Sequence, residues 1–195
     1  TPTPSTGWLI VQGRVRLLSV CNQRPQFRSA TVLQVGDILG ADHWFYSTPL
    51  PYTAIAASSC EMMPISETQV SALTASDPRL AVAWRSQMQQ RAQQIFFKRY
   101  TCLQSLPSHL LRHLLLPRIH TIDLEAGQPV RTALVPYEGY FWLGFGEVCC
   151  SKAPEQRLKI GAGWRDRDHD LADWVADGPT QLYQLRVHPW EIAEL

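Results

Sequence analysis

The residues best suited to chemistry are gathered in segment 165–173, whose sequence is RDRDHDLAD. Carboxylate and imidazole groups are common metal ligands, so Asp166, Asp168, His169, Asp170 and Asp173 are candidates for a metal site. The segment lacks the glycine and the distal glutamate of a calcium loop, and no second histidine stands nearby at ligand spacing. The pattern therefore favours a solvated acidic loop, and we expect no metal site here.

Other arrangements that support catalysis are also missing from the sequence. His109 and His113 have helical spacing, but no glutamate lies between them and no third ligand accompanies them. There is no Gly-x-Ser-x-Gly, P-loop or Gly-x-Gly-x-x-Gly motif, and no His-x-His pair of a cupin-like metalloenzyme. We therefore expect that the chain is not an enzyme.

Composition limits the partners and the compartment. The chain has 195 residues, 45% hydrophobic and 18% charged, which is typical of a globular protein. A net charge of +1 argues against nucleic-acid binding, because that affinity comes mainly from clustered Lys and Arg. No apolar run approaches the ~20 residues of a membrane helix. Five cysteines without CxxC spacing are typical of reduced thiols, so we expect a cytoplasmic protein.

Short strands separated by glycine turns dominate the sequence, and helices interrupt them. Ser66 and Gln69 form a capping box, which predicts a short helix over 67–73. Asp77 before Pro78 predicts the start of a long helix that runs to about Tyr100. A short leucine-rich helix is expected between the prolines at 107 and 117.

The long helix has an apolar stripe that includes Leu80, Trp84 and Met88. The stripe has two interpretations, which the sequence does not separate. It either faces the core, or it is partly exposed on a connector helix that mediates a homodimer or contacts a partner.

The strand patterns occur twice. Residues 8–15 match 141–148, at an offset of 133. Residues 33–37 match 158–162, at an offset of 125. Residues 54–56 and Met62 match 174–176 and Leu182, at an offset of 120. Short antiparallel strands with glycine turns are typical of small barrels and jelly rolls. We expect a mainly β fold with helices, in which two jelly-roll barrels, 1–100 and 101–195, are joined by the long helix.

The ordered series of motifs resembles the cyclic nucleotide-binding domain family. GWLIVQGRVRLL, LQVGDILGA, LPYTAIAA, EMMPISETQVSAL and SDPRLAVAW follow in the family's order, and IDLEAGQPV, GYFWLGFGEV, LKIGAGW and LYQLRVHPWEIAEL look like a second, shorter-looped copy. The first copy lacks the family's opening strands, and the second ends without its closing helix. The resemblance implies tandem cyclic nucleotide-binding-like domains.

The residues that bind ligand in this family are replaced. Where the family has a Gly-Glu pair for the ribose, this sequence has Gly40 and Ala41, with Asp42 one residue late. Where the family has an arginine for the cyclic phosphate, it has Tyr52, followed by Thr53 and Ala54. Tyrosine and threonine donate hydrogen bonds but do not neutralise a phosphate. We therefore expect these positions to be the remnant of a ligand site and expect no cofactor. Cyclic AMP and cyclic GMP are the ligands that the resemblance would imply.

In the second copy, the equivalent loop is the acidic segment described above, and crowded carboxylates repel a phosphate. In the first copy, Trp44 and Phe45 lie in the ligand loop. They are predicted either to fold over the vacant site or to dock on a partner, and the first is favoured.

The resemblance therefore implies a non-enzymatic regulatory module that controls an attached or partner protein. The replaced residues look most like regulatory regions attached to bacterial peptidase-containing ABC exporters. The alternative is a sensor that binds a small ligand or a cyclic nucleotide in the first domain, near Gly40, Tyr52 and Thr53.

Overall fold

The computed structural model describes residues 6–20, 27–44, 51–134, 139–165 and 171–186. The chain divides into two compact units, Thr1–Arg99 (unit 1) and Tyr100–Leu195 (unit 2). Both units are mainly β, and every strand pair described in them is antiparallel.

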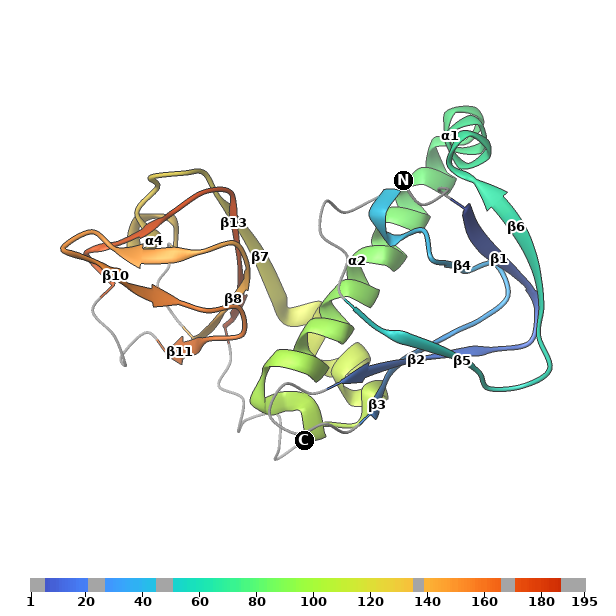
Figure 1. Ribbon diagram of the computed structural model, residues 1–195, viewed down its shortest axis with the longest axis horizontal. Helices are drawn as coiled ribbons and strands as arrows, with labels where there is room; N and C mark the ends of the chain where they lie inside the picture. The colour runs from blue at the N-terminus through green and yellow to red at the C-terminus, as the bar shows by residue number, and fades with distance from the viewer. Residues whose placement is uncertain (1–5, 21–26, 45–50, 135–138, 166–170, 187–195) are drawn as a thin grey trace. The chain divides into compact units, whose positions relative to one another are not determined.

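Unit 1 contains two three-stranded sheets, drawn in blue to cyan in Figure 1. The first has the order β4-β1-β6, with β1 (Thr6–Gln12), β4 (Ile38–Leu39) and β6 (Glu61–Ser66). The second has the order β3-β2-β5, with β2 (Val15–Val20), β3 (Phe27–Leu33) and β5 (Thr53–Ala56). Apolar residues between the sheets form one core cluster: Ile10, Val15, Leu17, Ala30, Leu33 and Ile95.

The two helices predicted for unit 1 are confirmed. The helix α1 (Glu67–Ser76) begins with the capping box of Ser66 and Gln69, although it runs three residues further than predicted. The helix α2 (Pro78–Tyr100) begins after Asp77, whose side chain accepts a hydrogen bond from the Arg79 N–H at 3.0 Å. A second core cluster lies between these helices and the β4-β1-β6 sheet: Ile38, Ala41, Ile65, Val70, Trp84 and Met88.

Unit 2 contains a four-stranded sheet of order β11-β8-β13-β7 and a three-stranded sheet of order β10-β9-β12. The strands are β7 (Ile119–Leu124), β8 (Tyr140–Phe145), β9 (Val148–Cys150), β10 (Ala153–Leu158), β11 (Gly163–Arg165), β12 (Trp174–Ala176) and β13 (Thr180–Leu185). A short helix, α4 (Val130–Ala133), lies between β7 and β8 in the sequence.

The leucine-rich helix predicted between the two prolines is present but irregular. It begins as α3 (Ser108–Leu110), continues as one π-helical stretch over Leu111–Leu115, and ends as a 3₁₀ turn over Leu116–Arg118. Pro117 lies in this last turn. A proline lacks the N–H that a regular helix needs in its interior, so the helix ends there.

The strand pairings of unit 1 recur in unit 2 at the offsets seen in the sequence. Val15 lies opposite Leu33 and Ala56. Val148 lies opposite Leu158 and Ala176 in the same way. The pairs Ile10–Met62 and Leu143–Leu182 correspond as well. Only unit 2 adds a further strand, β7, at the edge of β13 in the part of the chain that the structure describes.

A glycine turn joins the sheets in the same way in both units. Ile10 donates to the Asp37 carbonyl at 3.0 Å and accepts from the Gly36 N–H at 2.9 Å. Leu143 makes the same two bonds, to Ala162 at 2.9 Å and from Gly161 at 2.8 Å. Gly36 and Gly161 have φ of 90° and 87°, a left-handed conformation that a Cβ disfavours.

The expected closed barrels are not found. In the described ranges each unit has two separate open sheets, and no sheet closes on itself. The physical reason is the shortness of several strands, such as β4 with two residues, because their ladders end before they can bridge one sheet to the next.

The two turn glycines provide a matched stability test. Gly36→Ala and Gly161→Ala each place a Cβ on a residue with left-handed φ. Each is therefore expected to lower the free energy of unfolding by about 1–2 kcal/mol. At Gly161 the new Cβ also lies 2.6 Å from the Tyr100 Cβ and 2.7 Å from its carbonyl oxygen, whereas at Gly36 nothing lies within 4 Å. We expect Gly161→Ala to lower the urea midpoint of its unit clearly more than Gly36→Ala lowers that of unit 1. Equal shifts would contradict this.

Candidate functional site

The loop that replaces the family's ligand loop begins at the end of β4. Gly40 has a φ of 80°, which lets the chain turn sharply after Leu39. Ala41 is fully buried in the core cluster beside the helices. Asp42 opens a 3₁₀ turn, Asp42–Trp44, and its carboxylate points back into unit 1, where it meets side chains from two other elements.

The Asp42 carboxylate is the centre of this polar network. Its Oδ2 accepts a hydrogen bond of 2.5 Å from the hydroxyl of Tyr52, the residue before β5. Its Oδ1 lies 3.4 Å from the Arg91 guanidinium on α2, and the same guanidinium nitrogen donates to the Ile38 carbonyl at 2.8 Å. Asp42 therefore connects the β4 loop, β5 and α2.

Burial makes this network electrostatically strong. The side chains of Arg91 and Asp42 are 3% and 13% exposed, and a buried charge is costly unless an opposite charge accompanies it. Burial, and then the Asp42 charge, hold the pKa of Tyr52 well above its ordinary value of 10.0. Tyr52 is therefore a hydrogen-bond donor at neutral pH. One positive and one negative charge cancel, which leaves no net charge to attract a phosphate.

The structure brings together two of the predicted ligand-site residues, Asp42 and Tyr52, and adds Arg91, which the sequence reasoning missed. The signal was present, because Trp84, Met88, Arg91 and Ile95 have the spacing of one helix face. A lone arginine on an otherwise buried stripe requires a buried acid, and Asp42 supplies it. Thr53 and Ala54 are exposed on β5 and take no part in the network.

Trp44 is the aromatic residue of this loop that the structure describes. Trp44 packs against the core cluster on the helix side of the sheet, where its ring would contact a Cβ added at Gly7. Trp44 is thus half-buried within unit 1, and its predicted role, either folding over the vacant site or docking on a partner, stays a prediction. Phe45 lies outside the described residues.

The stripe on α2 faces the core. Trp84 and Met88 are 7% and 1% exposed, and Leu80 packs against the same cluster. Trp84 and Met88 are therefore buried within unit 1, whereas Leu80 is half-buried. The core-facing interpretation is confirmed for Trp84 and Met88, and the predicted homodimer or partner contact stays a prediction.

Unit 2 fills the space between its sheets with its own apolar side chains. Phe141 and Trp164, at matching places on β8 and β11, stack with centroids 5.9 Å apart and are 0% and 2% exposed. Leu171, which ends the acidic loop, is buried in the same core cluster with Val130 and Leu134. Residues 166–170 of the loop, which include four of the five candidate metal ligands, lie outside the described residues. The fifth, Asp173, forms an ion pair with Lys152 at 2.6 Å.

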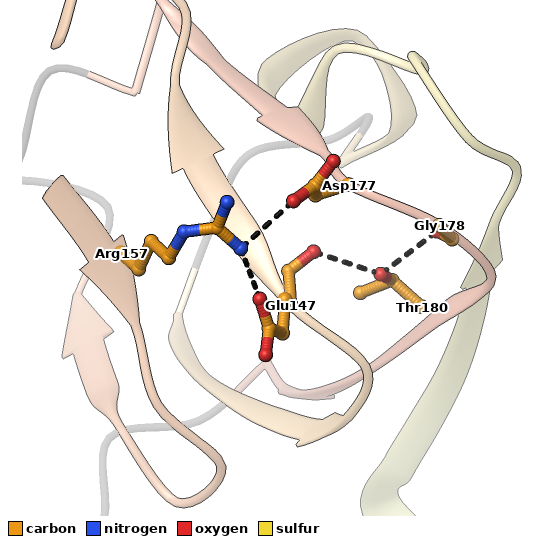
Figure 2. A network of polar contacts seen from close by, with 5 residues as sticks. All are labelled: Glu147, Arg157, Asp177, Gly178 and Thr180. Carbon is orange, nitrogen blue, oxygen red and sulfur yellow. Dashed lines mark hydrogen bonds and ion pairs between the residues drawn. The ribbon is translucent and has the colours of Figure 1, made fainter. Parts of the chain in front are cut away.

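A second polar network lies on the surface of unit 2 (Figure 2). Arg157 on β10 binds the Glu147 carboxylate and the Asp177 carboxylate, the latter at 2.8 Å. Hydrogen bonding to Glu147 is the largest cause of the raised pKa of Arg157. Thr180 donates to the Glu147 carbonyl at 3.1 Å and to the Gly178 carbonyl at 3.0 Å. These contacts connect β10 with the β8–β9 turn and with the residues between β12 and β13. The arginine is paired with two carboxylates, which gives the network a net charge of −1, so we assign it a structural role.

The described ranges contain neither a candidate metal site nor a candidate membrane-spanning helix. They hold no group of three or more His, Cys, Asp or Glu placed to bind a metal ion. They also hold no helix long and apolar enough to span a membrane.

Comparison with known proteins finds similar solved structures but no matching family. No family model matches the chain, and no curated protein does. Among matching solved structures is the regulatory domain of Toxoplasma gondii PKA with cAMP, at 14% identity over 94% of this chain and 71% of that chain, with a TM-score of 0.38. Another is the guanosine-bound regulatory subunit of a cAMP-independent protein kinase A from Trypanosoma cruzi, at 15% identity over 95% and 66%, with a TM-score of 0.36.

A third is the c-di-GMP responsive regulator CLP of Xanthomonas campestris, at 16% identity over 63% and 67%, with a TM-score of 0.40. The chain spans 66 to 71% of the length of the two protein kinase A regulatory structures. TM-scores in this range do not assign a fold, so the two units must be judged on their own sequence and strand pairing. These comparisons lend no support to a link with an exporter.

The burial of the α2 stripe predicts a stability effect. Met88→Ala leaves a cavity in the core and is expected to lower the free energy of unfolding by about 2–5 kcal/mol. Val82→Ala is the matched control, because Val82 lies on the same helix and is 70% exposed. We expect it to change the free energy by less than about 0.5 kcal/mol. Chemical denaturation measures both, and a tolerated Met88→Ala would argue for an exposed stripe.

The raised pKa of Tyr52 predicts a loss of stability at alkaline pH. Below pH 10 both states keep the phenol proton. Above the ordinary pKa of 10.0 the unfolded chain releases it while the folded chain retains it, so the stability of unit 1 falls as pH rises. Tyr52→Phe removes this dependence and costs about 1–3 kcal/mol at neutral pH. Unfolding of both proteins between pH 8 and 11 measures the effect, and parallel profiles would contradict it.

Proposed function

We propose that this chain is a non-catalytic regulatory module of two cyclic nucleotide-binding-like units in tandem. In this proposal it acts by docking on an attached or partner protein, and neither unit binds a cyclic nucleotide in the family's usual way. The family's order of motifs in the sequence supports the assignment. The recurrence of the same strand pairings and the same glycine turn in both units supports the tandem arrangement.

The contact between Tyr52 and Asp42 carries the functional part of the proposal. These residues stand at or next to the positions where the resemblance places the phosphate-binding and ribose-binding groups. Here the two side chains bind each other, and the nearby cation, Arg91, is already paired with Asp42. A cyclic nucleotide would have to break a short buried hydrogen bond and bring its own negative charge beside that carboxylate, which is unfavourable.

Unit 2 supports the same conclusion by a different route. The stacked rings of Phe141 and Trp164 and the buried Leu171 occupy the space between its sheets. A ligand there would have to displace packed core side chains. Removing a large core side chain costs about 3–5 kcal/mol, which is a large part of the affinity of a small ligand.

Regulation by docking then depends on the outer surfaces of the module. The Trp84–Met88 stripe is packed inside unit 1, so we propose that a partner contacts other surfaces. No catalytic step is proposed, because the charged groups of both polar networks are paired with one another.

A second candidate function is a sensor for a small uncharged ligand in unit 1. One observation favours it. Trp8 lies opposite Leu39 and Pro64 on the face of the sheet that Ile10 turns towards the inner core, yet it is 42% exposed. The equivalent residue in unit 2, Phe141, is fully buried. An aromatic face of this kind stacks on a planar apolar ligand.

Calorimetry with three matched ligands separates the two functions. The chain is titrated with cyclic AMP, cyclic GMP and adenosine, which shares its base and ribose with cyclic AMP but carries no phosphate. A docking module gives no heat with any of the three. A sensor for an uncharged ligand gives heat with adenosine and none with the cyclic nucleotides.

Micromolar binding of either cyclic nucleotide would overturn the proposal, because it would mean that Tyr52, Thr53 and Arg91 replace the missing arginine. A cooperative thermal transition in the same buffer serves as the control that the chain is folded.

A further inference from the structure

The Asp42 carboxylate is held in the way that a protein site holds a free anion. Its Oδ2 accepts a hydrogen bond from the Tyr52 hydroxyl at 2.5 Å, and its Oδ1 lies 3.4 Å from the Arg91 guanidinium. Each oxygen thus has a donor from a different element, and one of the two donors is a cation. Charge-assisted hydrogen bonds of this kind are among the strongest that a carboxylate accepts. The Asp42 side chain therefore occupies what is, in chemical terms, a carboxylate site.

Arg91 keeps its place through contacts other than the one with Asp42. Its Nη1 also donates to the Ile38 carbonyl at 2.8 Å, and its side chain is 3% exposed. Its Nε is buried and makes no hydrogen bond within the described part of the chain. The contact with Asp42 uses Nη1 only and, at 3.4 Å, is long for a hydrogen bond. The guanidinium therefore has donor capacity that Asp42 leaves unused.

Tyr52 is also held independently of Asp42. Its ring packs against the core cluster between the two sheets of unit 1. Burial, and then the charge of Asp42, raise the pKa of its hydroxyl, and a phenol keeps its proton at neutral pH even without that charge. The hydroxyl therefore remains a hydrogen-bond donor if the Asp42 carboxylate is removed.

We propose that Arg91 and Tyr52 form a receptor for one carboxylate anion, and that Asp42 is its built-in ligand, which keeps the site closed to anions from solution. Among the described residues, Asp42 is the one acid that pairs with Arg91. A tethered carboxylate acts at an effective concentration far above that of free anions, so the parent chain excludes them. The inference rests on the proposed function for the view that this is the remnant of a ligand site, and it adds the class of ligand that the remaining donors accept.

Unit 2 provides an internal control. At the offset of 120, Ala172 stands at the position of unit 2 that corresponds to Tyr52 in unit 1. Alanine has no side-chain donor, so this receptor is not repeated there. The unfolding of unit 2 is therefore expected not to respond to a small carboxylate.

Formate tests whether the emptied site takes a carboxylate. Asp42→Ala removes a carboxylate, which is the size of a formate ion, and leaves both donors in place. We expect the variant to have a lower Tm than the parent, and sodium formate to raise it saturably, beyond the effect of equal sodium chloride. Formate at about five times its Kd is expected to raise the Tm of unit 1 by about 4–8 °C. Thermal unfolding followed by circular dichroism measures this.

Two further variants show whether the effect uses this site. Asp42→Asn removes the charge but fills the same space with an amide, so formate has no room and should act only as chloride does. Combining Asp42→Ala with Arg91→Met removes the cation, so formate should lose its effect. The parent chain should likewise respond to formate no more than to chloride, because its own carboxylate fills the site.

A formate effect on Asp42→Ala that is no larger than the chloride effect would overturn the proposal, and so would an equal effect on Asp42→Asn. If Asp42→Ala is unfolded without formate, the same titration follows the recovery of its far-UV signal, and the same two outcomes decide. The proposed function is tested separately, by calorimetry of the parent chain with cyclic nucleotides. A missing formate effect leaves that result unchanged, so the two failures are distinct.

Discussion

The pairing of the Asp42 carboxylate with Arg91 and Tyr52 is the interaction on which unit 1 depends. The carboxylate is the partner that lets Arg91 be buried on α2, and it accepts a hydrogen bond from the hydroxyl of Tyr52, the residue before β5. Removing one of these side chains leaves the others buried without a partner. The loss in folding free energy is then larger than the net stabilisation that the intact network provides. The position of the β4 loop, the first residues of β5 and the middle of α2 are therefore mutually fixed. The same arrangement removes the free cation that a cyclic phosphate requires.

The two units show how one backbone pattern accepts two kinds of interior. The glycine turns and most strand registers agree between them, because these are set by backbone hydrogen bonds and by φ angles that glycine adopts at low cost. The registers differ at β10, where Cys150 lies opposite Ala153, whereas the equivalent Leu17 lies opposite Thr31. The side chains carried by the strands differ. Unit 1 has a polar network and an exposed Trp8, and unit 2 has a stacked aromatic pair in an apolar core. A shared pattern of strands therefore does not imply a shared ligand.

Local sequence patterns predicted the helices and strands well, but they did not predict whether the sheets close into barrels. The capping box at Ser66 and the Asp77–Pro78 pair gave the starts of α1 and α2, since both are contacts between residues close in sequence. The regular helix expected before Pro117 has a π-helical stretch instead. The expected barrels are open sheets in the described residues, because closure depends on strand lengths and stagger that no local pattern encodes.

The internal repeat, the turn glycines and the loss of the family's ligand residues can all be read from the residues themselves, because each rests on residue type and spacing. The partners of Asp42 cannot. Arg91 is 49 positions away from it, and only the packing of α2 against the sheet brings the two charges together. The same packing decided that Trp84 and Met88 belong to the core and that Trp44 joins them there. An apolar stripe is compatible with either a core or an interface, and its role depends on which surface the rest of the chain places against it.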